Sequence, residues 1–494
     1  MSQSEPPALR PKARRARGLM DRRGPGLALE RGLIARIAKV YEEWGFEPLE
    51  TPAFEYADAL GKFLPDQDRP NEGVFAFEDD GEWVALRYDL TAPLARFVAE
   101  NFDALPKPYR RWAAGPVWRN EKPGPGRYRE FWQCDADTVG SASPAADAEM
   151  IAMACAALEA AGARASVIKI SSRGLLDGIL SGAGIDDPTQ RMAALRAIDK
   201  VDRLGWQGVK QLLGEQRIDE SGDVTPGARL PENAIDSIMS LVMYTTDSEV
   251  RGGTRQAFLK VLEDTVKSGS GEKALVELAE IDHALCALKV PDIRARFDIS
   301  IVRGLEYYTG AVFEAELISD SMDTLEDKIR LGSIGGGGRY DDLIARFRGE
   351  KIPATGFSIG VSRLAAALQA QAAAQADGPV VVLVMDQARI GEALAMAAEL
   401  RAAGVRAEAY LGGGAMKAQL KYADKRASPV AVIQGGDELA KGVVTLKDLK
   451  LGAAMAQGLG TDRDGWAKAR ETLQREVPRG ELAAAVRAML AGKA

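Results

Sequence analysis

Residues 116–137 read PVWRNEKPGPGRYREFWQCDAD, a stretch that predicts two neighbouring β-strands joined by a loop rich in proline and glycine. Side chains alternate between the two faces of a strand. In the second strand one face therefore carries Phe131, Gln133, Asp135 and Asp137, and the other carries Trp132, Cys134 and Ala136. A sheet with its apolar face on a core and its other face open to a ligand has this pattern. An ordinary solvated face is the alternative, and an aromatic ring among polar groups favours the ligand.

The rest of the chain predicts further elements and a second domain. Apolar residues at the spacing of one helix face predict a helix over 27–46. Residues 174–285 predict a mostly helical region with basic positions, which the stretch 220–233 interrupts. After a low-complexity segment at 369–379, which is expected to be a linker, strand and helix patterns alternate, so we expect a small α/β domain with a largely parallel sheet. A final helical stretch is predicted over about 464–491.

Composition excludes several classes of protein. No segment reaches the ~18 consecutive apolar residues that a membrane helix needs, so no membrane partner is expected. The three cysteines, Cys134, Cys155 and Cys286, lack disulfide or metal spacing, which fits a reducing cytoplasm. The single histidine, His283, excludes sites that need several histidines. Because the net charge is −7, a nucleic acid partner must meet local basic patches.

Two groups of residues suggest chemistry. The guanidinium groups of Arg119 and Arg363 suit phosphate oxygens, Phe131 could stack on a purine, and Glu121 could accept from an exocyclic amine. Together they are consistent with an ATP site. The run SIGGGGRY lacks the Lys-Ser/Thr ending of a P-loop. The turn VRGLEYYTG at 302–310 fits a site for a negative charge and a small aromatic group that forms hydrogen bonds.

Five stretches occur along the chain in this order: LRYDLTAPLARFVAE (86–100), PVWRNEKPGPGRYREFWQCD (116–135), VRGLEYYTG (302–310), GGGGRYD (335–341) and GFSIGVSRL (356–364). Together they resemble the class II histidyl-tRNA synthetases. PVWRNE…GRYREF and GFSIGVSRL are typical of class II synthetases generally, whereas VRGLEYYTG and GGRYD are typical of the histidine enzymes. The resemblance runs from about Gly18 to about Asp448.

The resemblance implies an α+β fold with an antiparallel-sheet catalytic core, a helical insertion that contacts the acceptor arm of tRNA, and an α/β anticodon-binding domain. It also implies a cytoplasmic homodimer with the segment around Pro52 near the interface. We expect a flexible basic tail at 1–17, a catalytic core at 18–173 and 286–370, an insertion domain at 174–285, and an anticodon-binding domain with a C-terminal helical extension at 379–494.

The implied reaction uses ATP, with Mg²⁺, to join L-histidine to tRNA-His through histidyl-adenylate. By resemblance, Arg119 holds the α-phosphate and Arg363 the γ-phosphate. Phe131 stacks on the adenine, and Glu121 reads its amine. Arg303 lies against the α-phosphate and the substrate carboxylate, where it offsets the charge that builds during attack. Arg119 and Arg303 are thus the expected catalytic residues, and the sequence assigns no metal ligand.

The resemblance also implies how histidine is recognised. A carboxylate and a phenol on the two ring nitrogens would reject amino acids that leave these groups unpaired, so no editing domain is expected. Besides Arg303, the expected contacts are Asp89, Thr91 and Gln133 to the α-amine, and Asp137, Tyr308 and Tyr340 to the imidazole.

Plainer interpretations remain open at several positions. Asp89 or Thr91 could be a helix cap, and the glycines 335–338 could only permit a tight turn. Tyr307 is expected in the core. The loop at 122–126 lacks a long polar side chain at its centre, so the sequence leaves open how the acceptor end of the tRNA is read.

Two other functions are consistent with parts of the pattern. One is a non-catalytic regulatory subunit of ATP phosphoribosyltransferase, a class of related chains that usually lacks the C-terminal domain and the arginine and tyrosine set. The other is a class II enzyme for a different amino acid. Arg303, Tyr308 and the region after residue 379 favour the histidine enzyme.

Overall fold

The structure is a computed structural model of the 494-residue chain. It describes residues 12–63, 73–123, 128–246, 254–266, 269–304, 307–318, 332–371, 377–459 and 473–492. Most of the predicted basic tail and the centre of the 122–126 loop therefore lie outside the described residues. The chain forms two compact units, residues 1–373 and 374–494.

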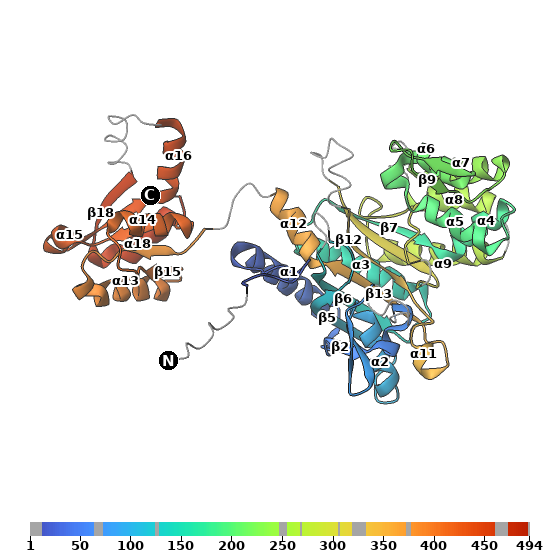
Figure 1. The fold of residues 1–494 in the computed structure, drawn as a ribbon, viewed down its shortest axis with the longest axis horizontal. Coiled ribbons are helices and arrows are strands. Elements are labelled where there is room, and N and C mark those ends of the chain that lie inside the picture. Colours follow the sequence, from blue (N-terminus) through green and yellow to red (C-terminus); the bar gives the residue numbers. More distant parts are fainter. Residues whose placement is uncertain are drawn as a thin grey trace, which may run out of the picture. The chain divides into compact units, whose positions relative to one another are not determined.

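An eight-stranded sheet forms the centre of the larger unit (Figure 1). Its six central strands are antiparallel neighbours, and the short edge strands β1 and β10 pair in parallel. The antiparallel-sheet core expected from the sequence is confirmed. In spatial order the strands are β1 (Glu47–Pro48), β5 (Tyr109–Trp118), β6 (Glu130–Val139), β13 (Ala354–Gly360), β12 (Ser333–Arg339), β11 (Ala311–Leu317), β7 (Ser166–Ser172) and β10 (Ala295–Phe297).

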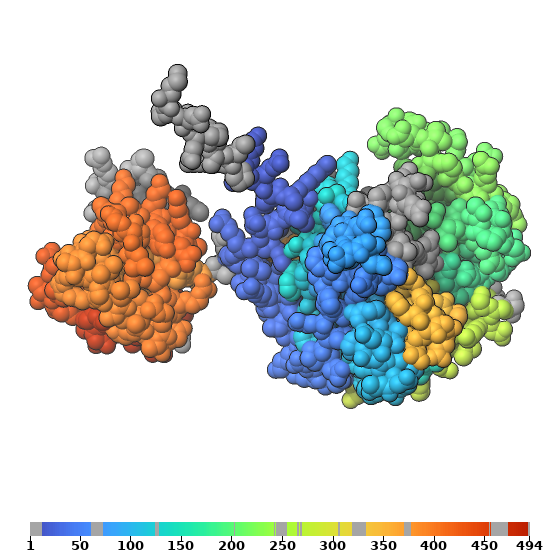
Figure 2. All heavy atoms as spheres, turned by 60° about the horizontal axis from the view of Figure 1, so that its bottom comes forward, coloured from blue at the N-terminus to red at the C-terminus, as the bar shows by residue number. Residues whose placement is uncertain are grey.

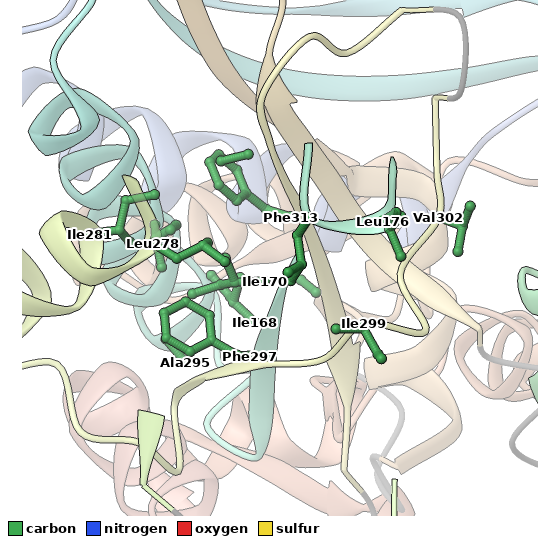
Figure 3. Close-up of a cluster of buried hydrophobic side chains, with 14 of the residues drawn as sticks. Ile168, Ile170, Leu176, Leu278, Ile281, Ala295, Phe297, Ile299, Val302 and Phe313 are labelled. Carbon is green, nitrogen blue, oxygen red and sulfur yellow. The ribbon is translucent and has the colours of Figure 1, made fainter. Parts of the chain in front are cut away.

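Helices α1 (Gly24–Glu43), α3 (Pro144–Ala160) and α12 (Val361–Gln371) pack on the apolar face of this sheet. The predicted alternation of β6 holds, because Cys134 and Ala136 are fully buried in that core. Figure 3 shows part of the same core around Phe313 of β11 and Phe297 of β10. Burying each large apolar side chain contributes about 1.5–3 kcal/mol. Val302 belongs to this cluster and anchors the segment that leads to the predicted site.

A small sheet and three helices lie beside the main sheet. The strand order is β2 (Phe54–Tyr56), β4 (Glu82–Leu86), β3 (Ala76–Asp79), and the neighbouring helices are η1 (Ala57–Phe63), α2 (Thr91–Asn101) and α11 (Ala345–Arg348). Arg346 donates to the carbonyl oxygen of Asp58 at 2.9 Å, and the Arg348 guanidinium lies 4.2 Å from the Phe102 ring centroid. These contacts join α11 to η1 and α2, whose surfaces adjoin in Figure 2. Pro52 lies between β1 and β2, outside both strands.

The region predicted to be helical forms a group of helices on one side of the unit, drawn in green in Figure 1. They are α4 (Arg173–Gly182), α5 (Pro188–Ile198), α6 (Val201–Leu213), α7 (Glu232–Thr246), α8 (Arg255–Thr265) and α9 (Ser270–Ala287), and the hairpin of β8 (Gln216–Ile218) and β9 (Val224–Pro226) interrupts them. Buried Arg255 pairs with Asp282 at 2.6 Å and donates to the Ala295 carbonyl at 2.7 Å. The ion pair joins the start of α8 to α9, and the hydrogen bond joins it to edge strand β10.

The second unit is an α/β domain, as predicted, but its five-stranded sheet is mixed and not largely parallel, since two of its four strand pairings are antiparallel. Its strand order is β15 (Ala407–Ala409), β14 (Val380–Val382), β16 (Val430–Ile433), β17 (Val443–Asp448), β18 (Gln474–Pro478). The first three strands are parallel, and the last two pair antiparallel. Its helices are η3 (Gln387–Arg389), α13 (Ile390–Ala402), α14 (Met416–Lys425), α15 (Gly436–Lys441), α16 (Leu449–Leu459), η4 (Arg479–Glu481) and α18 (Leu482–Leu490).

Two sequence-based boundaries near this unit were wrong. The predicted helical stretch 464–491 contains β18, which pairs with β17 and buries Val477 in the domain core. A strand of five residues with one buried apolar side chain is too short to give a period, and its partner strand decides its conformation. The low-complexity segment at 369–379 also begins inside α12, which continues to Gln371. The domain boundaries predicted from the sequence stay a prediction.

Candidate active site

The polar face of the eight-stranded sheet brings together residues from distant parts of the chain. Directly opposed residues in antiparallel strands point to the same face. Two neighbouring rows on this face contain charged groups on either side of one or two central glycines or at one end. One row is Ala113, Asp135, Ser358, Gly336, Glu314 and Lys169, and the other is Arg111, Asp137, Gly356, Gly338, Val312 and Ser171.

The glycines 335–338 form part of strand β12, so the interpretation as a tight turn was wrong. A Cβ atom at Gly336 would lie 3.1 Å from Nη1 of Arg303, and one at Gly338 would lie 2.9 Å from the Tyr308 ring. The missing side chains therefore leave the room over the sheet that Arg303 and Tyr308 occupy. On the opposite face, Gly335 and Gly337 lie against Phe357 of β13.

Arg303 and Arg363 converge on one residue that the sequence analysis did not single out, Ser333. Arg303 donates from Nη1 to the Ser333 hydroxyl at 2.8 Å, and Arg363 donates from Nη1 to its carbonyl oxygen at 2.6 Å. Arg363 lies in the first turn of α12, directly after β13, as the sequence predicted. Arg303 also pairs with Glu314 at 2.9 Å, and its side chain is 41% exposed. Burial raises the pKa of the Glu314 carboxyl, and the nearby Arg303 opposes this shift.

Arg119 lies between two aromatic rings. Its guanidinium carbon is 4.3 Å from the Tyr88 ring centroid and 5.0 Å from that of Phe131. The Tyr88 hydroxyl is 3.4 Å from Oε1 of Glu121. The four residues thus form one cluster, and Tyr88 is the member that sequence reasoning missed. The hydroxyl of Ser362 accepts from the backbone N–H of Trp132 at 3.1 Å, which brings the start of α12 against the start of β6.

Asp137 is 2% exposed and binds two groups. Its Oδ1 accepts a hydrogen bond from the Tyr340 hydroxyl, and its Oδ2 lies 2.7 Å from Nη2 of Arg111. Burial raises the pKa of Asp137, whereas Arg111 opposes the shift. Arg111 is fully buried, and the sequence analysis overlooked it although it lies directly opposite Asp137 on β5.

Three tyrosines stack beside this pair. The ring of Tyr307 lies edge-on to Tyr308 at 5.1 Å between centroids and is tilted against Tyr340 at 5.6 Å. The prediction that Tyr307 packs in the core is supported by these contacts, although its ring is only partly buried. Tyr308 and Tyr340, predicted to meet the imidazole, are therefore brought to the same end of the sheet as Asp137.

Gln133 and Asp135 are joined through Ser358. Nε2 of Gln133 donates to the Ser358 hydroxyl at 2.6 Å, and Ser358 also hydrogen-bonds to Asp135. Gln133 is 8% exposed and Asp135 2%. Oε1 of Gln133 and Oδ1 of Asp135 have no hydrogen-bond partner in the described part of the chain. The pKa of Asp135 is raised to about 7, mainly by burial and also by the charge of Asp137, while Arg111 and the hydrogen bond to Ser358 oppose the shift.

Asp89 and Thr91 lie at the start of α2. Oδ1 of Asp89 accepts from the backbone N–H groups of Thr91 and Ala92, at 3.0 and 2.9 Å. The capping role that the sequence left open for Asp89 is therefore present. It fixes the carboxylate beside the sheet face and uses one of its two oxygens.

Ser333, Ser358, Tyr88 and Arg111 are the residues that sequence reasoning missed. Ser358 alternates with Gly356 and Gly360 along β13, so a period of two could have placed it on the polar face. Ser333 and Tyr88 carry no comparable signal. Within the described residues, no group of three histidine, cysteine or acidic side chains could hold a metal ion. No helix among them is both long and apolar enough to cross a bilayer.

The sequence and the structure are similar to characterised proteins over nearly the whole chain. Residues 18–364 match the family described as Histidyl-tRNA synthetase, and residues 379–488 match the Anticodon binding domain. A Histidine--tRNA ligase of Caulobacter vibrioides is 56% identical, with 98% of each chain covered, and one of Rhodopseudomonas palustris strain BisB18 is 52% identical, with 97% and 96% covered. The crystal structure of histidyl-tRNA synthetase from Nostoc sp. PCC 7120 superposes with a TM-score of 0.71 at 29% identity, covering 97% of this chain and 99% of that one.

Proposed function

The chain belongs to the histidyl-tRNA synthetase family, and from this premise we propose how the polar face of its sheet joins histidine to tRNA-His. The enzyme is a class II histidine–tRNA ligase that uses ATP as a substrate. The histidine carboxylate attacks the α-phosphorus of ATP and displaces pyrophosphate, and a terminal ribose hydroxyl of the tRNA then displaces AMP from the histidyl-adenylate. The observation that carries the assignment of roles is the convergence of Arg303 and Arg363 on Ser333, in the sheet that also holds Asp137.

The arginines and the aromatic cluster are assigned to ATP. Arg119 and Arg303 bind the α-phosphate, and Arg363 binds the γ-phosphate end. The guanidinium fork suits phosphate oxygens and stays charged beside other arginines. Phe131 stacks on adenine and Glu121 accepts from its amine. Arg303 also meets the substrate carboxylate, so that attack takes place between groups already positioned for the developing charge.

Histidine is bound by the other half of the face. Asp89, Thr91 and Gln133 hold the α-ammonium group. The imidazole meets Tyr308 and the pair of Asp137 and Tyr340, which are buried and already hydrogen-bonded to one another. An amino acid without two ring nitrogens cannot pair with both Tyr308 and the Asp137–Tyr340 pair, which gives roughly 10⁴-fold discrimination.

We propose that Mg²⁺ accompanies ATP. Because the described residues offer no group of three metal-binding side chains, the ion would be bound mainly by phosphate oxygens and water, as Mg²⁺ usually is in nucleotide sites. It would neutralise phosphate charge, and we assign no protein ligand to it.

Exchange of labelled pyrophosphate into ATP, measured with each of the twenty amino acids, tests the proposed function. We expect exchange with histidine alone, because only histidine satisfies both sides of the imidazole site. Exchange with another amino acid would indicate a different class II enzyme, and no exchange at all would indicate the regulatory paralogue. The paralogue is not favoured, because ligases match this chain from end to end.

We assign tRNA contacts to two regions. Residues 374–494 would bind the anticodon, as the matching domain family suggests. The helical region would meet the acceptor arm through exposed Arg196 and Arg203. Lys210, another basic position of this region, is already paired with Asp236 and Glu232, at 3.0 and 3.1 Å, and contributes less net charge to such a surface.

We propose that the enzyme is a homodimer that uses the segment next to Pro52. Phe54, Tyr56 and Phe77 share one face of the small sheet and are 49%, 60% and 47% exposed. Clustered exposed aromatic rings are typical of protein interfaces.

In sedimentation velocity, Phe54→Asp combined with Tyr56→Asp is expected to convert dimer to monomer. Trp83→Ser, on the opposite face of the same sheet, is the control, and a dimer that survives the double substitution contradicts this interface.

A cytoplasmic location is proposed as well. Its support is that Cys134, Cys155 and Cys286 are all free thiols, which persist in reducing compartments.

A further inference from the structure

Asp135 lies on the polar sheet face but has no role in the scheme above. It occupies β6 between Gln133 and Asp137, and every second residue of a strand points to the same face. It is 2% exposed, and its Oδ1 atom has no hydrogen-bond partner in the described residues. A buried carboxylate oxygen without a partner is costly, so its retention here calls for a bound cation or donor.

Within the described residues, Asp135 forms no direct ion pair with the two arginines nearest to it, Arg111 and Arg87. Arg111 binds Oδ2 of Asp137 at 2.7 Å and the Leu90 carbonyl at 2.9 Å. Arg87 donates to the carbonyl oxygens of Pro116 and Thr51, at 2.9 and 2.8 Å. Three carboxylates, those of Asp89, Asp135 and Asp137, lie in this region with two guanidinium groups, of which Arg111 pairs with Asp137 and Arg87 is bound to carbonyl oxygens. The site therefore has a place for one further positive charge.

Two unpaired acceptor atoms indicate which kind of ligand group would bind here. Oε1 of Gln133 and Oδ1 of Asp135 are both acceptors, both buried and two residues apart on one strand face. Nε2 of Gln133 is held by Ser358, so its Oε1 is the atom left to bind a ligand, and the same serine hydroxyl fixes Asp135. Two fixed acceptors, one of them charged, suit a small cation with several N–H donors, and an ammonium group has three.

We propose that Asp135 is a specificity-determining residue that accepts a hydrogen bond from the α-ammonium group of the histidine substrate. Gln133 accepts a second hydrogen bond from the same group, and Ser358 holds both side chains in place. The inference rests on the proposed function, because it uses histidine as the ligand. It adds a charged partner to a subsite otherwise assigned to Asp89, Thr91 and Gln133. Asp135 thereby distinguishes amino acids from imidazole compounds that lack the ammonium group.

Three ligands that differ by one group test this proposal on the full-length protein. Histidine carries imidazole, carboxylate and ammonium, histidinol lacks the carboxylate, and 3-(imidazol-4-yl)propionate lacks the ammonium. The KM for histidine in pyrophosphate exchange and the inhibition constants of the other two would be measured at pH 8, above the pKa of about 7 of Asp135, for the wild type and Asp135→Asn.

We expect Asp135→Asn to raise the KM for histidine and the inhibition constant of histidinol about tenfold to a hundredfold, since a hydrogen bond between charged groups is lost. The inhibition constant of the propionate should change less than about twofold. Ser358→Ala should give the same pattern with a smaller effect and serves if Asp135→Asn does not fold. Ser166→Ala, which changes a buried serine at the start of β7 in the same sheet, is the matched control.

Two outcomes overturn the proposal. Equal weakening of all three ligands means that Asp135 only supports the structure, and no change in any of them means that it does not touch the ammonium group. If the wild-type protein gives no exchange with histidine, the proposed function itself fails, and that result is distinct from both.

Discussion

Arg303→Ala is expected to lower the rate of histidine-dependent pyrophosphate exchange about a thousandfold while the protein stays folded. Removing one group that stabilises charge in a transition state typically lowers kcat about 10²–10³-fold. Arginines at a transferring phosphoryl group can contribute more, roughly 10³–10⁵-fold. Arg303 is 41% exposed and contacts Ser333 and Glu314 at the surface of the sheet, so its loss opens no cavity in the core. The effect should fall mainly on kcat.

The measurement is steady-state exchange with a thermal melt of each variant. Arg389→Ala, which removes a partly exposed arginine paired with Glu392 in the second unit, should change exchange less than about twofold. If Arg303→Ala retains a tenth or more of the wild-type rate, the residue serves only as the ion-pair partner of Glu314.

Gly337→Ala is expected to destabilise the larger unit by about 4 kcal/mol or more, an effect that few single substitutions reach. The added Cβ would overlap the carbonyl oxygen of Gly356 and come within 2.8 Å of Cα of Phe357. These are backbone atoms of the paired strand β13, which cannot move aside as the end of a flexible side chain could. The ladder between β12 and β13, on which the site depends, would have to separate.

Chemical denaturation followed by tryptophan fluorescence gives the free energy of unfolding for this test. Gly26→Ala in α1 is the control in the same unit, because a Cβ there meets only the end of the Gln369 side chain, at 3.5 Å. It should change the free energy of unfolding by less than about 1 kcal/mol. A Gly337→Ala protein as stable as this control would mean that β12 and β13 are spaced differently.

Much of the site could be predicted from local patterns and the resemblance. The alternation in 130–139 places Gln133 and Asp137 on one face, and the strand-to-helix pattern at 356–364 places Arg363 at a helix start. Ser333 could not be found in this way, because its role comes from two arginines that lie 30 residues to either side of it in sequence. Asp135 was assigned to the right face but given no role, since its unpaired oxygen exists only once the neighbouring strands are in place.

The sequence by itself determined which residues share a strand face, where α1 and the second α/β unit lie, and which family the chain resembles, because these follow from short-range periodicity and ordered motifs. Only the tertiary structure decided that the glycines 335–338 are a strand and that residues 474–478 pair with β17. It alone decided which rows of the sheet bring Asp135, Ser358 and Gly336 together. The physical reason is that strand pairing joins distant segments through backbone hydrogen bonds and packing, and the local sequence pattern of one strand does not specify its partner.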